Sequence, residues 1–202
     1  MGTGKARQRW KRTAACVTVC LLWWPPIATP VVPGQGGTST EYRQKAMVLA
    51  NLPKFIDWPV AAFLGAEAPL QTCVYGSFSF GTALAEAVRG QIVHGRRMEV
   101  RWAKQEGELH SCHVLFLSGL DRTRLGRALE AVRGGATLTV GESEEFLKLG
   151  GIVNLGSENE RTYFDVSLES AARGPLKISS KLLMLARHVV KPQGAGKPEP
   201  VA

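Results

Sequence analysis

Short apolar segments alternate with amphipathic ones through the middle of this chain, and that alternation is the strongest constraint on its fold. Segment 113–117 is apolar at nearly every position, as expected for a strand buried on both faces of a sheet. The other strand-like segments are 70–75, 98–103 and 137–140, and the helix-like segments are 82–89 and 121–133. Strands that alternate with helices predict a largely parallel α/β sheet with right-handed crossovers.

The flanking sequence predicts further elements on both sides of this core. Residues 41–52 carry an apolar helical stripe, with Thr40 as the expected N-cap and Pro53 as the expected end. The later elements expected are a short helix from Ser143 to Leu149, a hairpin of strands 152–155 and 162–166 around 156–159, and helices over 168–173 and 178–189.

We therefore predict an α/β fold: a single domain with a mostly parallel sheet, flanking helices and a late antiparallel hairpin. The domain spans residues 41–190 and follows a flexible leader at 35–40. Residues 191–202 contain three Pro and two Gly and almost no apolar side chains, so we expect a disordered tail there.

The first 34 residues have the pattern of an export signal. Five cations lie in the first twelve residues, and the apolar run at 14–24 suits a signal peptide but is too short to span a bilayer. Without residues 1–34 the chain has 20 basic and 17 acidic side chains, so its formal net charge falls from +8 to +3. This fall weakens a nucleic-acid-binding interpretation. We predict cleavage near residue 34 and a periplasmic mature chain; the alternative is an uncleaved N-terminus that anchors the chain to a membrane.

Two cysteines, Cys73 and Cys112, remain after such a cleavage. An even number of cysteines in an oxidising compartment favours a disulfide, and a loop of about 40 residues corresponds to roughly 4 kcal/mol in the chain-entropy description. Two buried free thiols are the alternative, and they become the better interpretation if the protein is cytosolic.

The sequence contains few signs of catalytic chemistry. There is no G-x-S-x-G motif and no pair of carboxylates at a readable spacing. His110 and His113 flank Cys112, but residues three apart on a strand point to opposite faces, so we predict no metal site. A helix start at 76–81 could meet an anion, although a tight turn explains it better. We predict a binding protein without catalytic residues, metal or cofactor.

Six motifs, in order and with matching spacing over residues 42–190, resemble the YfiR family of periplasmic regulators. The first two are carried by Lys45, Ala46, Leu49, Asn51, Lys54, Phe55, Trp58 and Pro59, and by Pro69, Leu70, Cys73, Val74 and Gly76. The others are carried by Cys112, His113, Leu115, Phe116 and Ser118; by 138–140; by Phe146, Gly150, Gly151 and Ile152; and by 178–187.

This resemblance implies a periplasmic protein that restrains an inner-membrane diguanylate cyclase through the periplasmic domain of the cyclase. Cyclic di-GMP and biofilm formation would then be low until an OmpA-like outer-membrane lipoprotein sequesters the regulator. The resemblance also implies a disulfide between Cys73 and Cys112. The second bridge of some family members would need cysteines near Leu147 and Asn154, and this sequence has none there.

We expect the partner to contact the hairpin strand and the segment before the last helix, at Asp165, Leu168, Lys177 and Ser179. The alternative is that these residues only cap and pack the C-terminal helix. A homodimer is a further option. The second functional hypothesis is a periplasmic sensor of a small ligand that signals to another membrane protein, such as a histidine kinase. A periplasmic hydrolase is the third, but the sequence shows no nucleophile–base pair for it.

Overall fold

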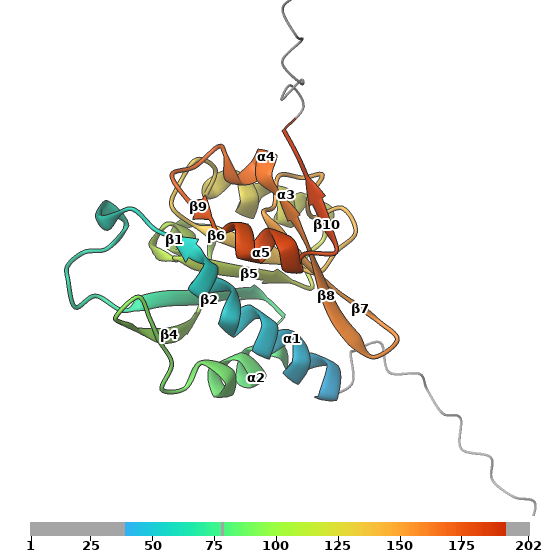
Figure 1. Cartoon of the computed structure of the whole chain (residues 1–202), viewed down its shortest axis with the longest axis horizontal. Coiled ribbons are helices and arrows are strands. Elements are labelled where there is room, and N and C mark those ends of the chain that lie inside the picture. Colours follow the sequence, from blue (N-terminus) through green and yellow to red (C-terminus); the bar gives the residue numbers. More distant parts are fainter. Residues whose placement is uncertain (1–38, 78, 193–202) are drawn as a thin grey trace, which may run out of the picture. The chain divides into compact units, whose positions relative to one another are not determined.

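An eight-stranded sheet organises residues 39–77 and 79–192, the part of the chain that this computed structural model describes (Figure 1). Its strands, in spatial order, are β10 (His188–Val190), β8 (Arg161–Ser167), β7 (Val153–Glu158), β6 (Leu138–Gly141), β5 (Val114–Ser118), β2 (Leu70–Gly76), β4 (Arg96–Trp102) and β3 (Ile92–Val93). The run from β7 to β4 is parallel, whereas β7 and β8 form an antiparallel hairpin. The predicted fold class is confirmed.

Helices cover both faces of this sheet. The helices are α1 (Ser39–Asn51), α2 (Ser79–Val88), α3 (Arg122–Ala131), α4 (Leu168–Ala171) and α5 (Ser180–Leu185), with 3₁₀ turns η1 (Leu52–Phe55), η2 (Val60–Ala62) and η3 (Glu106–Ser111). A small second sheet pairs β1 (Ile56–Asp57) with β9 (Lys177–Ile178). In Figure 1, α2 lies below β2 and β4, whereas α3 lies above β5 and β6.

The fully buried strand β5 explains the apolar run in the sequence. Val114 and Phe116 belong to the core beneath α1 and α2, whereas Leu115 and Leu117 belong to the core beneath α3. Successive side chains of a strand point to opposite faces, so each face needs its own apolar residues. Asp121 caps α3 as predicted, accepting a hydrogen bond from the Arg124 backbone N–H at 2.9 Å.

Several predicted elements differ in detail. Helix α1 begins at Ser39, so Thr40 lies in its first turn and is not its N-cap, and α2 begins at Ser79 instead of Thr82. Residues 143–149 form successive turns and not a helix. The hairpin turn is shifted to Asn159 and Glu160, which both have positive φ, as a two-residue turn between twisted strands requires.

The predicted helix over 178–189 is wrong at both ends. Ile178 pairs with Ile56 in the small sheet, only Ser180–Leu185 is helical, and His188–Val190 forms β10 beside β8. Pairing with strands distant in the sequence overrides a local helical pattern there. The expected signal peptide, residues 35–38 of the expected leader and most of the tail lie outside the described residues, whereas Ser39 and Thr40 of that leader already belong to α1, so the domain begins two residues earlier than predicted.

His113 joins three segments at the start of β5. Its Nδ1 accepts a hydrogen bond from the Gln71 backbone N–H at 3.0 Å, so the proton of the neutral ring is on Nε2, which lies 3.0 Å from the carbonyl oxygen of Ala62. The Phe63 ring stacks on His113 with 4.3 Å between centroids. Burial, assisted by the positive charge of Arg96, lowers the pKa of His113 below its ordinary value of 6.5.

We predict that protonation of His113 makes the protein less stable in mild acid. The unfolded chain binds this proton at about pH 6.5, whereas the folded chain binds it only at lower pH, so stability is retained above that pH and falls below it. His113→Asn keeps an acceptor for Gln71 but cannot titrate. In urea unfolding at a series of pH values, we expect the free energy of unfolding of the variant to change less than that of the wild type between about pH 7 and about pH 5. Equal slopes in the two proteins would contradict this assignment.

Candidate functional site

The ends of β2 and β5 are the place where an open α/β sheet would ordinarily bind a ligand. The chain leaves β2 towards β4 and leaves β5 towards β6, and ligands bind where the connections of neighbouring parallel strands diverge in this way. Here the Ser77 backbone N–H donates to the carbonyl oxygen of Ser118 at 2.8 Å, which joins the two strand ends. Gly76 has a φ of 109°, and a Cβ there would collide with the Ser118 carbonyl oxygen, so the join requires glycine.

Helix α1 inserts Lys45 beside this position. Its Nζ lies 2.9 Å from Glu41 Oε1 and 3.1 Å from Glu142 Oε2, and Ser118 Oγ donates to Glu142 Oε1 at 2.5 Å. Burial opposes the charge on Lys45, but its hydrogen bonds and charge interactions with Glu41 and Glu142 outweigh burial and raise the pKa of Lys45. The chain therefore supplies both the cation and the anions here, and Lys45 is only 8% exposed.

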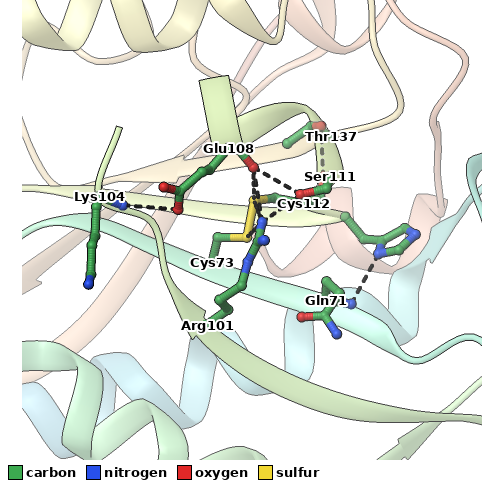
Figure 2. The surroundings of a disulfide bond; sticks show 9 residues. Gln71, Cys73, Arg101, Lys104, Glu108, Ser111, Cys112 and Thr137 are labelled. Carbon is green, nitrogen blue, oxygen red and sulfur yellow. Dashed lines mark hydrogen bonds between the residues drawn. A yellow bond between two sulfur atoms is a disulfide. The ribbon is translucent and has the colours of Figure 1, made fainter. Parts of the chain in front are cut away.

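A disulfide joins Cys73 of β2 to Cys112, which directly follows η3 (Figure 2). Their Cα atoms are 5.7 Å apart, and both residues are buried in the core beneath α3. This is the pairing that the family resemblance implies. The bridge fixes η3 to the centre of the sheet.

The side chain of Arg101 contacts this bridge. The sequence analysis predicted the bridge but not this contact. Arg101 is opposite Cys73 in the register of β4 on β2, and its Nη2 lies 3.7 Å from Cys73 Sγ and 3.6 Å from Cys112 Sγ. The same nitrogen donates to the carbonyl oxygen of Glu108 at 2.9 Å and to Ser111 Oγ at 2.5 Å. Figure 2 shows the guanidinium between the two sulfurs and the η3 backbone. No sequence motif identifies this arginine. Its contact with the bridge could be predicted only from the pairing of β4 with β2, which places Arg101 opposite Cys73.

Asp165, the first predicted partner-binding residue, is only 8% exposed. Its carboxylate accepts hydrogen bonds from Arg187 Nε at 3.1 Å and Nη2 at 2.7 Å, and from the His188 backbone N–H at 3.1 Å. The hydrogen bond with Asp165 raises the pKa of Arg187, whose guanidinium carbon also lies 3.5 Å from the Tyr163 ring centroid. Asp165 thus fastens the segment that follows α5 to strand β8.

The other three predicted partner-binding residues lie on different elements. Leu168 begins α4 and is half-buried, whereas Lys177 is exposed in β9 opposite Asp57. Ser179 caps α5, with its Oγ accepting from the Lys181 N–H at 3.3 Å. Within residues 39–77 and 79–192, no hydrogen bond or ion pair links any two of the four predicted residues. Their role in partner binding stays a prediction.

Helix α5 exposes two large apolar side chains that the sequence analysis did not identify. Met184 is 77% and Leu185 is 64% exposed. An uninterrupted helix over 178–189 would place Leu185 on the same face as the buried Leu182, but α5 ends at Leu185, and Ala186 is already extended. We call Lys177, Ser179, Met184 and Leu185 the α5 surface.

Neither a metal-binding cluster nor a membrane-spanning helix is present among the described residues. Neither 39–77 nor 79–192 contains a group of three His, Cys, Asp or Glu side chains arranged to hold a metal ion. In those same ranges, no helix has the length and apolar character needed to cross a membrane.

Comparison with known proteins gives a family match, and the chain is also similar to solved structures. The family model described as YfiR/HmsC-like matches residues 42–187. One similar solved structure is a conserved domain protein from Vibrio cholerae O1 biovar El Tor strain N16961, with a TM-score of 0.47 and 11% sequence identity. That match covers 73% of this chain, which spans only 60% of the length of the other.

We predict that Arg101 contributes to stability separately from the disulfide. Arg101→Met keeps most of the apolar stem but removes hydrogen bonds to Glu108 and Ser111, so we expect the free energy of unfolding to fall by about 2 kcal/mol. The disulfide should still form, because both cysteines keep their positions. Guanidinium chloride unfolding measures the loss, and a count of free thiols in the denatured protein reports the bridge.

Arg97→Met is the matched control, because Arg97 is exposed on the same strand. Its free energy of unfolding should stay within about 0.5 kcal/mol of the wild type. If Arg101→Met were as stable as Arg97→Met, the contribution assigned to Arg101 would be wrong.

Proposed function

The chain belongs to the YfiR/HmsC-like family, and from this we propose that it is an exported periplasmic regulator without catalytic activity. It restrains an inner-membrane diguanylate cyclase by binding the periplasmic domain of the cyclase, and so lowers cyclic di-GMP and biofilm formation. An OmpA-like outer-membrane lipoprotein relieves the restraint by sequestering the regulator.

The observation that carries a protein-binding role is the exposure of Met184 and Leu185 on neighbouring positions of α5. Burial of a leucine or methionine side chain contributes about 1.5–3 kcal/mol, so covering both would supply a substantial part of an interface. Lys177 and Ser179 precede this helix, and Lys177 adds an exposed positive charge at its border. The proposed interface is the α5 surface.

In this proposal Asp165 does not contact the partner but holds α5 in position. Its bonds to Arg187 and His188 hold the chain where it leaves α5, and Ser179 holds the other end by capping the helix. A rigid helix loses little conformational freedom on binding, which favours affinity. Charge reversal at Asp165 would therefore disturb folding, so substitutions at exposed positions are better tests of binding.

In this proposal the regulator restrains the cyclase by binding its inactive conformation more tightly than its active one. A binding protein shifts an equilibrium between active and inactive forms only by the difference in its affinity for the two. Moving a cyclase from 99% active to 99% inactive would require about a 10⁴-fold preference for the inactive form. Sequestration by the lipoprotein then works by mass action, because it lowers the concentration of free regulator.

A groove beside the disulfide favours the second candidate function, a small-ligand sensor that signals to a membrane protein such as a histidine kinase. The groove has a volume of about 650 Å³ and is lined by Leu64, Pro69, Arg101, His110 and His113, among others. Leu64 is fully exposed at its border. A ligand held there would contact the segment next to the bridge.

We predict that the double substitution Met184→Glu and Leu185→Glu abolishes the restraint. Two carboxylates in place of two apolar side chains cannot be desolvated at an interface without partners, so affinity should fall at least about 100-fold. A host strain that lacks the gene would carry each variant, and intracellular cyclic di-GMP would be measured. The double variant should leave cyclic di-GMP at the level of the deletion strain.

Leu64→Glu is the matched control, since it places a carboxylate at another exposed leucine. It should restore low cyclic di-GMP like the intact gene, with both proteins present at equal amounts and with the disulfide formed. Release by Leu64→Glu and not by the double variant would favour the groove beside the disulfide over the α5 surface.

A further inference from the structure

The outer side of β4 is only partly covered in the part of the chain that the structure describes. Strand β3 pairs only with Arg96 and Arg97. From Met98 to Trp102, the strand that β4 pairs with is β2, on the inner side. The Met98 N–H points away from β2 and donates to the carbonyl oxygen of Gln91 at 3.0 Å. The Ala103 N–H points towards β2 and donates to the carbonyl oxygen of Val74 at 3.0 Å. We call these two directions outward and inward.

Backbone groups of alternate residues in a strand point the same way. The N–H and C=O groups of Val100 and Trp102 therefore point outward, as those of Met98 do. No strand among the described residues pairs with this outer side of Val100 and Trp102. They form an edge to which a further strand can bond.

An apolar groove of about 440 Å³ lies beside this edge. Its apolar lining is Ala85 and Val88 of α2 together with Ile92, Met98, Val100 and Trp102. Ile92 is 65% exposed and Trp102 is 37% exposed. In Figure 1, α2 lies next to β4 at this end of the sheet. Proteins ordinarily cover an edge strand or make it short and charged, so an apolar groove along an open edge is a feature of binding surfaces.

The charges beside the groove select the kind of segment that fits it. Arg89 and Arg97 line the groove and are exposed, and Lys104 is exposed just beyond the end of β4. Glu99 is the acidic residue in the groove lining, and its Oε2 already accepts a hydrogen bond from Gln71 Nε2 at 2.9 Å. A second copy of this chain would place these cations against one another, whereas an acidic segment would be attracted to them.

We infer that the outer edge of β4 accepts an extended, acidic segment of a partner protein as an added strand. Its backbone pairs with Val100 and Trp102, an apolar side chain enters the groove between α2 and β4, and carboxylates lie beside Arg89 and Arg97. Main-chain hydrogen bonds supply affinity and the groove supplies specificity in this binding mode. The inference does not rest on the proposed restraint of a cyclase, which uses the α5 surface next to the opposite edge strand, β10.

The test uses the full chain and two capped peptides of alternating residues, acetyl-Glu-Val-Glu-Val-Glu-Val-amide and acetyl-Lys-Val-Lys-Val-Lys-Val-amide. Backbone amide NMR signals are followed up to about 1 mM peptide, which detects weak binding. We expect the acidic peptide to shift the Val100 and Trp102 amides and to slow their hydrogen exchange, and the lysine peptide to do neither. Absence of these changes, or equal binding of both peptides, would overturn the inference.

Val100→Pro removes one outward N–H without removing a donor to β2, a place where an edge strand tolerates proline. It should weaken binding of the acidic peptide at least about tenfold, whereas Val100→Thr, which keeps the N–H, should bind within about threefold of the wild type. Circular dichroism and the thiol count check folding. If Val100→Pro does not fold, the Arg89→Glu and Arg97→Glu double variant, which leaves the backbone unchanged, should lose the same binding.

Two measurements distinguish the other possible occupants of this edge: sedimentation equilibrium detects a dimer, and hydrogen exchange detects coverage by the chain itself. A dimer that Val100→Pro dissociates would show that a second copy occupies the edge. Slow exchange of the Val100 and Trp102 amides in the free monomer would show that the chain itself covers it. Either result would overturn the assignment to an acidic partner segment.

Discussion

Complete burial of β5 is the constraint on which the rest of this structure depends. A strand with apolar side chains on both faces needs helices on both sides of its sheet, and α1 with α2 on one face and α3 on the other provide them. The same arrangement brings the ends of β2 and β5 together where their connections diverge. There Lys45 and Ser118 both bond to Glu142, so the position at which such sheets commonly bind ligands holds the protein's own charges.

Two candidate surfaces for protein recognition lie towards the two edges of the sheet. At one edge, the Asp165–Arg187 pair and the Ser179 cap hold α5 so that Met184 and Leu185 face solvent. Towards the other edge, β4 keeps outward backbone groups beside an apolar groove with two arginines. The disulfide and Arg101 stiffen the sheet between them. Both surfaces are the ones that we propose for binding other protein chains.

Much of the fold could be predicted from the sequence, because its strongest signals are local. The apolar run of β5, the Asp121 cap and the alternation of strands with helices depend on neighbouring residues, and the structure has them. The C-terminal segment could not be predicted this way. Its helical pattern is divided by two strand pairings, with Ile56 and with Asp165, that depend on residues more than twenty positions away.

The candidate site was predictable only in part, for the same reason. The even number of cysteines favoured a bridge and the family resemblance implied it, but the position of Arg101 against both sulfurs depends on the register of β4 on β2. The acid at Asp165 was noted in the sequence, whereas its partner Arg187 follows from the return of β10 to β8. The exposure of Leu185 follows from where α5 ends, which its periodicity does not specify.

The most direct test of restraint of a cyclase is intracellular cyclic di-GMP in the native host with and without this gene, under conditions in which the protein is made. The account predicts that deletion raises cyclic di-GMP and that the intact gene returns it to the original level. A copy with Cys73→Ser should restore it poorly, because the bridge that anchors η3 is lost. An unchanged level on deletion would contradict the account and favour a ligand sensor that signals to another membrane protein.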